Sequence, residues 1–264
     1  MAQRKVWLSW VAQDTANGGP DASMAALKKN GLLPQGNRWV DDLAKAAWTE
    51  LLPVLSDVRR TDAWVIALDR ATFERASVRY SLAVLAGTVR TRRGEAYPIV
   101  VLGLDFVPAP EQLPVFLRAG PVYSATDGGW PAKLVASFFK KSAGAPQDFR
   151  FSVYASQYTG QWFEIGPKTQ AWDGVMFGVS GAAKITHHAV GPQGILPERT
   201  VLEYATKDIQ AKVGDTEFTV WSVQNSVTAE QSYFLKVEGY PAKVVFGGHA
   251  GAENAEVYVL GLSD

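Results

Sequence analysis

The chain has 264 residues, more than most single domains, so two domains are expected. Hydrophobic residues make up 47% and charged residues 20% of the chain, and this composition excludes an intrinsically disordered protein. Lys plus Arg (26) balances Asp plus Glu (26) and Cys is absent, which argues against nucleic-acid or anionic membrane partners, disulfides and thiolate metal sites.

The N-terminal part predicts an α/β domain. The apolar run after Lys5 is too short for a signal peptide or a membrane span, so a cytoplasmic location is expected. From Lys5 to Lys141, short apolar runs alternate with segments of helical period, a pattern typical of a parallel sheet covered by helices. The predicted strands are Val6 to Trp10, Trp64 to Leu68, Ile99 to Leu104 and Val122 to Ser124. One predicted helix is defined by apolar residues at helical spacing: Val40, Leu43, Ala44, Ala47, Leu51 and Val54. Three further predicted helices span Ala71 to Val89, Pro110 to Arg118 and Trp130 to Lys140.

A small, polar stretch from Ser142 to Asp148 predicts a boundary between an α/β domain (1–143) and an all-β domain (148–264). Beyond it the hydrophobic period changes to two and turn residues are frequent, which predicts a β-sandwich or barrel. The predicted strands are Phe151 to Val153, Trp162 to Ile165, Val175 to Val179, Lys184 to His188, Thr200 to Tyr204, Glu217 to Val223, Ser232 to Val237, Lys243 to Phe246 and Glu256 to Leu260.

Three fragments of the first half carry a family resemblance. The segment from Trp7 to Asp14 (Trp-Leu-Ser-Trp-Val-Ala-Gln-Asp) has an apolar pair, Ser, an aromatic residue and a later Asp; the segment from Pro34 to Trp39 has Pro and Gly before Trp. The block from Trp64 to Leu85 continues from an apolar strand through Asp69 into a helix. These fragments resemble Toll/interleukin-1 receptor (TIR) domains. The resemblance implies a flavodoxin-like sheet, a role in signalling or bacterial anti-phage defence, and assembly with other TIR-like domains or with itself.

Two departures from the family are visible. The segment between Asp14 and Pro34 is short, so the second strand is expected to be missing or reduced. The alignment also places Ser81 where TIR enzymes that cleave NAD carry a catalytic Glu. A hydroxyl has no negative charge with which to stabilise an oxocarbenium-like state. Glu74 lies two helical turns earlier on nearly the same face, so it is the substitute carboxylate to consider.

Ligands of this fold bind beyond the carboxyl ends of the strands. A pocket there for NAD or a related nucleotide, with no cofactor required, is the expectation. Its predicted residues are Ser9, Trp10, Asp14, Pro34, Gly36, Trp39 and Asp69.

The β domain is rich in aromatic residues, most of which alternation assigns to the core. Tyr158, Trp162 and Trp172 are flanked by Gly and Gln and are the predicted partner contacts. His187 and His188 are adjacent on a predicted strand and therefore point to opposite faces, and no metal site is expected.

Three hypotheses follow. In the first, the protein is a TIR-like signalling or effector protein that binds a nucleotide or assembles without cleaving NAD. In the second, it is an active NAD glycohydrolase whose carboxylate is Glu74 or comes from a neighbouring chain. In the third, the β domain binds carbohydrate and the α/β domain is a structural spacer.

Overall fold

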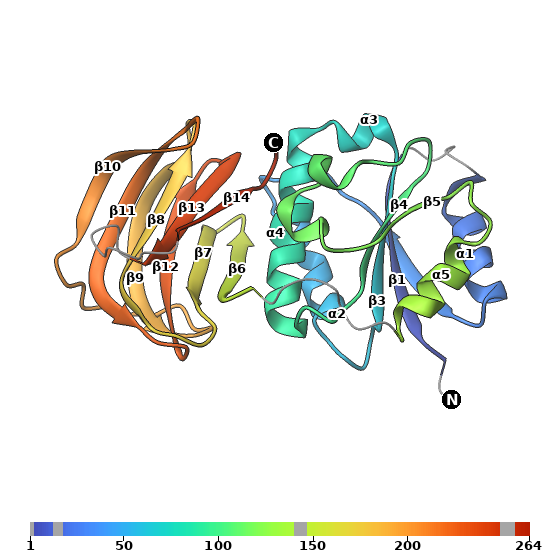
Figure 1. Ribbon diagram of the computed structural model, residues 1–264, viewed down its shortest axis with the longest axis horizontal. Coiled ribbons are helices and arrows are strands. Elements are labelled where there is room, and N and C mark those ends of the chain that lie inside the picture. The colour runs from blue at the N-terminus through green and yellow to red at the C-terminus, as the bar shows by residue number, and fades with distance from the viewer. Residues whose placement is uncertain (1–2, 13–17, 140–146, 249–256) are drawn as a thin grey trace. The chain divides into compact units, whose positions relative to one another are not determined.

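The structure is a computed structural model that describes residues 3–12, 18–139, 147–248 and 257–264 (Figure 1). The chain divides into two compact units, Met1–Ala145 and Pro146–Asp264. Residues 142–146 of the predicted boundary from Ser142 to Asp148 lie outside the described residues. No helix within the described ranges is long and apolar enough to cross a membrane.

The first unit is a five-stranded parallel sheet with helices on both faces. The strand order is β2-β1-β3-β4-β5. Its strands are β1 (Lys5–Val11), β2 (Leu33–Arg38), β3 (Ala63–Leu68), β4 (Ile99–Gly103) and β5 (Val122–Ser124). Its helices are α1 (Gly19–Lys29), the 3-10 helix η2 (Ala47–Leu51), α2 (Leu52–Leu55), α3 (Arg70–Phe73), α4 (Ala76–Arg93), the 3-10 helices η3 (Pro110–Gln112) and η4 (Val115–Leu117), and α5 (Trp130–Ser137).

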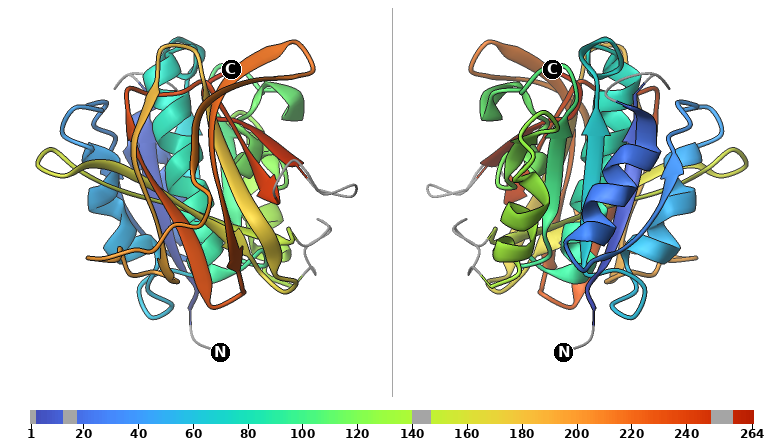
Figure 2. Two further views of the ribbon diagram at one scale, coloured as in Figure 1. Left: turned by 90° about the vertical axis from the view of Figure 1, so that its left-hand side faces the viewer. Right: turned by 90° about the vertical axis from the view of Figure 1, so that its right-hand side faces the viewer.

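The two central strands explain why the sheet forms. All residues of β3 and β4 are buried, as their unbroken apolar sequences require between two helical layers. One face packs Leu8, Val65 and Leu102 against Leu27 of α1 and Leu134 of α5. Figures 1 and 2 show α1 and α5 on this face, while α2 and α4 cover the other.

The second strand is present, contrary to the expectation that it would be missing or reduced. β2 pairs with β1 in parallel register from Lys5 with Leu33 to Trp10 with Arg38. It forms after α1, which fits into the short segment because its N-terminal Gly18 and Gly19 both have positive φ and Pro20 occupies an early helical position.

Three predicted helices differ from the structure. Residues 40–46 are not helical, and Ala46, with φ of 51°, precedes the short turns of η2 and α2. The predicted helix from Ala71 to Val89 is interrupted at Arg75, whose ψ of 121° is extended. The segment from Pro110 to Arg118 forms two 3-10 turns, because Pro114 between them cannot donate the hydrogen bond of a continuous helix.

The second unit consists of two antiparallel sheets. Their orders are β10-β11-β8-β13-β14 and β6-β7-β12-β9. The strands are β6 (Phe149–Ser156), β7 (Gly160–Pro167), β8 (Trp172–Ser180), β9 (Lys184–Pro192), β10 (Thr206–Val213), β11 (Thr216–Val227), β12 (Gln231–Glu238), β13 (Lys243–Gly248) and β14 (Val257–Gly261).

Aromatic side chains join the two sheets into a sandwich. The ring centroids of Phe163 in β7 and Phe177 in β8 are 5.4 Å apart, and those of Phe149 in β6 and Phe246 in β13 are 5.0 Å apart. Such tilted and edge-on ring pairs add specific geometry to the burial of apolar surface. The inward-facing aromatic residues of alternate strand positions therefore form the core.

One predicted strand of this unit is misplaced. The strand expected at Thr200 to Tyr204 begins instead at Thr206, because Tyr204 has a φ of 45° and the pairing of β10 with β11 is irregular around Asp208, whose φ is 57°. Glu256, the expected start of the last strand, lies outside the described residues.

Candidate functional site

The carboxyl edge of the parallel sheet is the first candidate site. The strand order changes direction between β1 and β3, and ligands of open α/β sheets bind beyond the carboxyl ends of the strands at such a point. Trp10, Trp39 and Asp69 all lie at this edge, and the backbone N–H of Trp39 donates to the carbonyl of Trp10 at 3.0 Å. Asp14 lies outside the described residues.

The hydroxyl of Ser9 is part of an internal hydrogen-bond chain. It accepts from the indole N–H of Trp64 at 3.0 Å and donates to Oδ1 of Asn37 at 3.0 Å. The same Asn37 oxygen accepts from the indole N–H of Trp7 at 2.9 Å. Asn37 lies opposite Ser9 in the register of β2 on β1. Ser9 is fully buried, so it stabilises the sheet and does not face a ligand.

Replacing Ser9 with Ala is expected to lower the free energy of unfolding by about 1–3 kcal/mol. The reason is that the buried indole N–H of Trp64 loses its acceptor and Asn37 loses a donor. Urea unfolding measures the change. Ser124→Ala, which removes a partly exposed hydroxyl bonded to Thr126, is the control and should shift stability by less than about 0.5 kcal/mol. Equal stability of the two variants would contradict the internal role of Ser9.

The two predicted tryptophans have different surroundings. Trp10 is buried in the apolar core on the α1 and α5 face. Trp39 lines a cavity of about 170 Å³ together with Asn37 and Trp48. Both indole N–H groups are buried and have no hydrogen-bond partner among the described residues. The cavity beside Trp39 is smaller than the roughly 300–1,000 Å³ of typical ligand pockets, so by itself it is too small for a dinucleotide.

Pro34 and Gly36 belong to β2 and not to a loop, which corrects the placement implied by the resemblance. Gly36 is required for packing, because a Cβ at this position would collide with the backbone oxygen of Leu8 and lie 2.8 Å from Cε of Met24. A close approach of strand and helix explains this glycine without a ligand.

The predicted polar residues around α3 and α4 are dispersed. Asp69 is buried and caps α3, with Oδ1 accepting from the backbone N–H of Thr72 at 2.7 Å. Glu74 is exposed at the end of α3. Ser81 is only 3% exposed within α4. One turn earlier, Ser77 donates to the carboxylate of Asp41 at 2.8 Å, an interaction that the sequence pattern did not predict.

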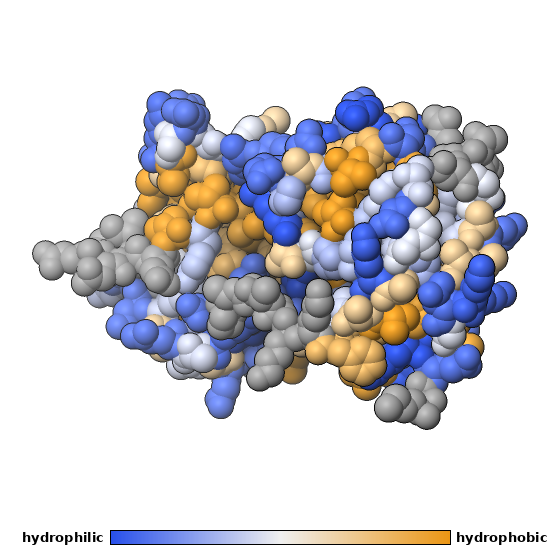
Figure 3. Space-filling model, turned by 45° about the vertical axis from the view of Figure 1, so that its right-hand side comes forward, coloured by the Kyte–Doolittle hydropathy of each residue, from blue (hydrophilic) through white to orange (hydrophobic). Residues whose placement is uncertain are grey.

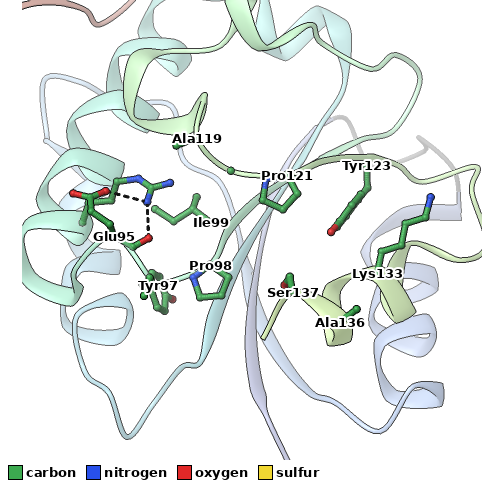
Figure 4. Close-up of a pocket in the computed structure, with 13 residues that line it drawn as sticks. Glu95, Tyr97, Pro98, Ile99, Ala119, Pro121, Tyr123, Lys133, Ala136 and Ser137 are labelled. Atoms are coloured by element: carbon green, nitrogen blue, oxygen red, sulfur yellow. Dashed lines mark hydrogen bonds and ion pairs between the residues drawn. The ribbon is translucent and has the colours of Figure 1, made fainter. Parts of the chain in front are cut away.

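A larger cavity of about 570 Å³ lies at the opposite, amino edge of the sheet (Figure 4). It is lined by residues that flank the starts of β4 and β5 and by the last turns of α4 and α5. Those drawn include Tyr97, Pro98, Ile99, Ala119, Pro121, Tyr123, Lys133, Ala136 and Ser137. Its size is that of a small-molecule pocket. None of its residues was predicted as a site, because they come from four separate segments of modest polarity.

The polar groups that line this cavity differ in whether they already have partners within the protein. Tyr97 is buried, its hydroxyl bonds to Thr61 at 2.9 Å, and burial raises the pKa of its phenol to about 12. The ammonium of Lys133 pairs with Asp127. Tyr123 is partly buried, and its hydroxyl points toward the space between Pro121 and α5 in Figure 4. The cavity is therefore mainly apolar, with a few donors at its margin.

Of the three predicted partner contacts of the second unit, Tyr158 and Trp162 belong to one sheet and Trp172 to the other. Tyr158 is 87% exposed at the β6–β7 turn. Trp162 is half-buried in β7, with its ring centroid 6.4 Å from that of His187. Trp172 begins β8 in the other sheet and packs near Phe246. Only Tyr158 is presented fully to solvent.

His187 and His188 point to opposite faces of β9. His188 lies against Tyr233, whose hydroxyl is 2.7 Å from its Nδ1, and its ring packs edge-on against Trp221. His187 lies beside Trp162. Across the described ranges, no three His, Asp or Glu side chains gather in a way that could hold a metal ion.

Stability is expected to fall between pH 6.5 and 4 because of His188. Burial, followed by Lys207 and His187, lowers the pKa of His188 from 6.5 to about 4. The unfolded chain therefore binds a proton in this interval that the folded chain does not, and acidification favours unfolding. The difference between urea midpoints at pH 7 and 4.5 should be smaller in His188→Asn than in the control His187→Asn. Equal differences would contradict the assignment.

Neither models of known protein families nor curated proteins match this chain. The site geometry therefore carries the functional argument. At the carboxyl edge of the sheet, most of the predicted site residues are engaged in internal contacts. A separate cavity lies at the amino edge.

Proposed function

We propose that the first unit is a flavodoxin-like, TIR-like module that acts in signalling, in the manner of bacterial anti-phage proteins, by binding a nucleotide or assembling with other TIR-like domains and not by cleaving NAD. The strand order β2-β1-β3-β4-β5 supports the fold, because it is one of the two common orders of doubly wound sheets. The order and the short sequence fragments together favour the resemblance over other parallel sheets.

The burial of Ser81 is the observation that carries the non-catalytic assignment. Ser81 is 3% exposed, and its hydroxyl carries no charge. Cleaving a nicotinamide–ribose bond develops positive charge on the ribose, and a carboxylate is the usual group that stabilises such charge. At the carboxyl edge, Asp69 is buried and its carboxylate caps α3. Ser81 therefore supplies no negative charge at the position where the family carries its catalytic Glu.

Calorimetric titration of the full chain with NAD and with ADP-ribose tests nucleotide binding. Binding of either compound without release of free nicotinamide is the expected result. Absence of heat with both would remove the nucleotide function and leave assembly, which light scattering over a concentration series measures directly. A protein that stays monomeric and binds neither compound would overturn the proposal.

The exposed carboxylate of Glu74 favours one alternative, an active NAD glycohydrolase. Glu74 lies at the end of α3, and its carbonyl accepts from the guanidinium of Arg79 at 2.9 Å. Release of nicotinamide at high protein concentration, and its loss in Glu74→Gln, would establish this alternative. Release that persists in Glu74→Gln would point to a carboxylate elsewhere.

The exposed surface does not identify a partner by itself. Figure 3 shows hydrophobic side chains in several separate areas of one face, with hydrophilic residues between them. Scattered apolar residues of this kind are normal on soluble proteins. Self-assembly is therefore proposed from the family resemblance and is tested by the scattering experiment.

A further inference from the structure

The cavity at the amino edge of the sheet contains a buried cation. The side chain of Arg90 lines the cavity and is 5% exposed. Its Nε donates to the carbonyl of Phe116 at 2.8 Å, and its Nη1 contacts the carbonyl of Glu95 at 3.4 Å and the carboxylate of Glu95 at 3.5 Å. Arg90 makes no hydrogen bond through Nη2 to any described residue. A guanidinium carries two N–H donors on this atom.

Most of the other walls are apolar. Pro98, Ile99 and Pro121 form part of the lining, and Ala119 and Ala136 lie at its margin. In Figure 4 the prolines, Ile99 and the ring of Tyr123 surround the space between the sheet and α5. A ligand that fills this space needs an apolar body, because the walls offer few hydrogen-bond partners.

The charges of the lining favour an anion. The carboxylate of Glu95 lies 3.5 Å from Nη1 of Arg90, which is longer than a normal hydrogen bond. The ammonium of Lys133 also lines the cavity, although its pairing with Asp127 is exposed and therefore worth little. Burial lowers the pKa of Arg90, but a guanidinium stays charged in proteins. An acceptor oxygen at Nη2 would form a charge-assisted hydrogen bond in a poorly hydrated place.

We propose that this cavity binds a small organic carboxylate with an apolar or aromatic body, whose carboxylate accepts from Nη2 of Arg90. The site lies at the opposite edge of the sheet from the proposed nucleotide site. The inference is therefore independent of the function proposed for that edge.

The test uses the full chain and 2-naphthoate as the probe, with 2-naphthamide as its neutral counterpart of equal shape. In calorimetry, naphthoate is expected to bind with a dissociation constant below about 1 mM, and naphthamide at least about tenfold more weakly, which is about 1.4 kcal/mol. No heat with naphthoate at millimolar concentration overturns the proposal. Equal binding of acid and amide overturns the role of the anion.

Variants at the margin of the cavity test the location without disturbing Arg90, whose contacts hold Phe116 and Glu95. Ala136→Phe places a ring in the cavity from an exposed position of α5 and is expected to weaken naphthoate binding at least tenfold. Ala132→Phe is the matched control, because Ala132 is exposed one turn earlier on α5 and does not line the cavity. Binding that Ala136→Phe leaves unchanged would place the probe elsewhere and refute the site.

Discussion

Replacing Glu164 with Gln is expected to lower the free energy of unfolding by about 3–5 kcal/mol, the cost of removing one of two opposite buried charges, Glu164 and Arg150, that attract each other electrostatically. Glu164 is 3% exposed, and its carboxylate accepts from the hydroxyl of Tyr154, the backbone N–H of Gly194 and the hydroxyl of Ser232, each at 2.7–2.8 Å. The guanidinium of Arg150 reaches the same Ser232 hydroxyl at 3.2 Å. The amide NH2 of Gln would face hydrogen-bond donors where the carboxylate offers an acceptor oxygen. The positive charge of Arg150 would also lose the negative charge that offsets it.

Urea unfolding followed by circular dichroism in the β-sheet region measures this change. Glu238→Gln, at an exposed carboxylate at the end of β12, is the control and should stay within about 0.5 kcal/mol of the unmodified protein. Ser232→Ala removes the hydroxyl that lies between the two charges, and an intermediate loss of about 1–3 kcal/mol is expected. A loss below 1 kcal/mol for Glu164→Gln would mean that water compensates the missing charge.

The sequence pattern was sufficient to predict those strands whose own residues show a clear hydrophobic pattern. The apolar runs of β3 and β4 have no alternative to burial on both faces, so they predict central strands of a parallel sheet. The aromatic alternation of β6, β7 and β8 similarly predicts two packed sheets, because one side of each strand must be covered. These elements are confirmed.

β2 was not recognisable because its sequence, Leu-Pro-Gln-Gly-Asn-Arg, has no strand propensity. It forms because β1 offers an unpaired backbone edge, and because Gly36 permits close contact with Leu8. Pro is tolerated on such an edge strand. The strand is thus a consequence of tertiary pairing and not of local pattern.

The segment from Val40 to Val54 shows the opposite error, because its pattern predicts one continuous helix that the structure does not contain. Its apolar spacing is helical, but Asp42 and the positive φ of Ala46 form a turn first. Oδ1 of Asp42 accepts from the backbone N–H of Lys45 at 3.0 Å, which also lowers the pKa of this carboxyl. Short Asp side chains compete with helix formation in this way.

The candidate sites depend on pairings that no single segment contains. The hydrogen-bond chain of Ser9 needs Asn37 and Trp64, which are brought together only by strand register. The amino-edge cavity needs Arg90, Tyr123 and Lys133 from three elements. The carboxyl edge as a ligand site therefore stays a prediction from the fold, and the side chains available at either edge could not be predicted from the sequence.

Introducing the missing carboxylate by Ser81→Glu is expected to destabilise the protein by about 4 kcal/mol or more and to release no nicotinamide from NAD. The position is 3% exposed. A carboxylate there must either stay protonated, with a pKa raised by about three units, or unfold its surroundings, and each unit corresponds to about 1.4 kcal/mol. Urea unfolding and a nicotinamide assay are the two measurements.

Ala76→Glu is the matched control on the same helix. Ala76 is exposed at the first residue of α4, where a negative charge interacts favourably with the helix dipole by about 0.3–1 kcal/mol. This variant should be as stable as the unmodified protein, or slightly more so, and equally inactive. If Ser81→Glu instead folds normally and releases nicotinamide, a ribose must reach this position. In that case the lack of catalysis would be explained by the loss of a single carboxylate and not by the burial of Ser81.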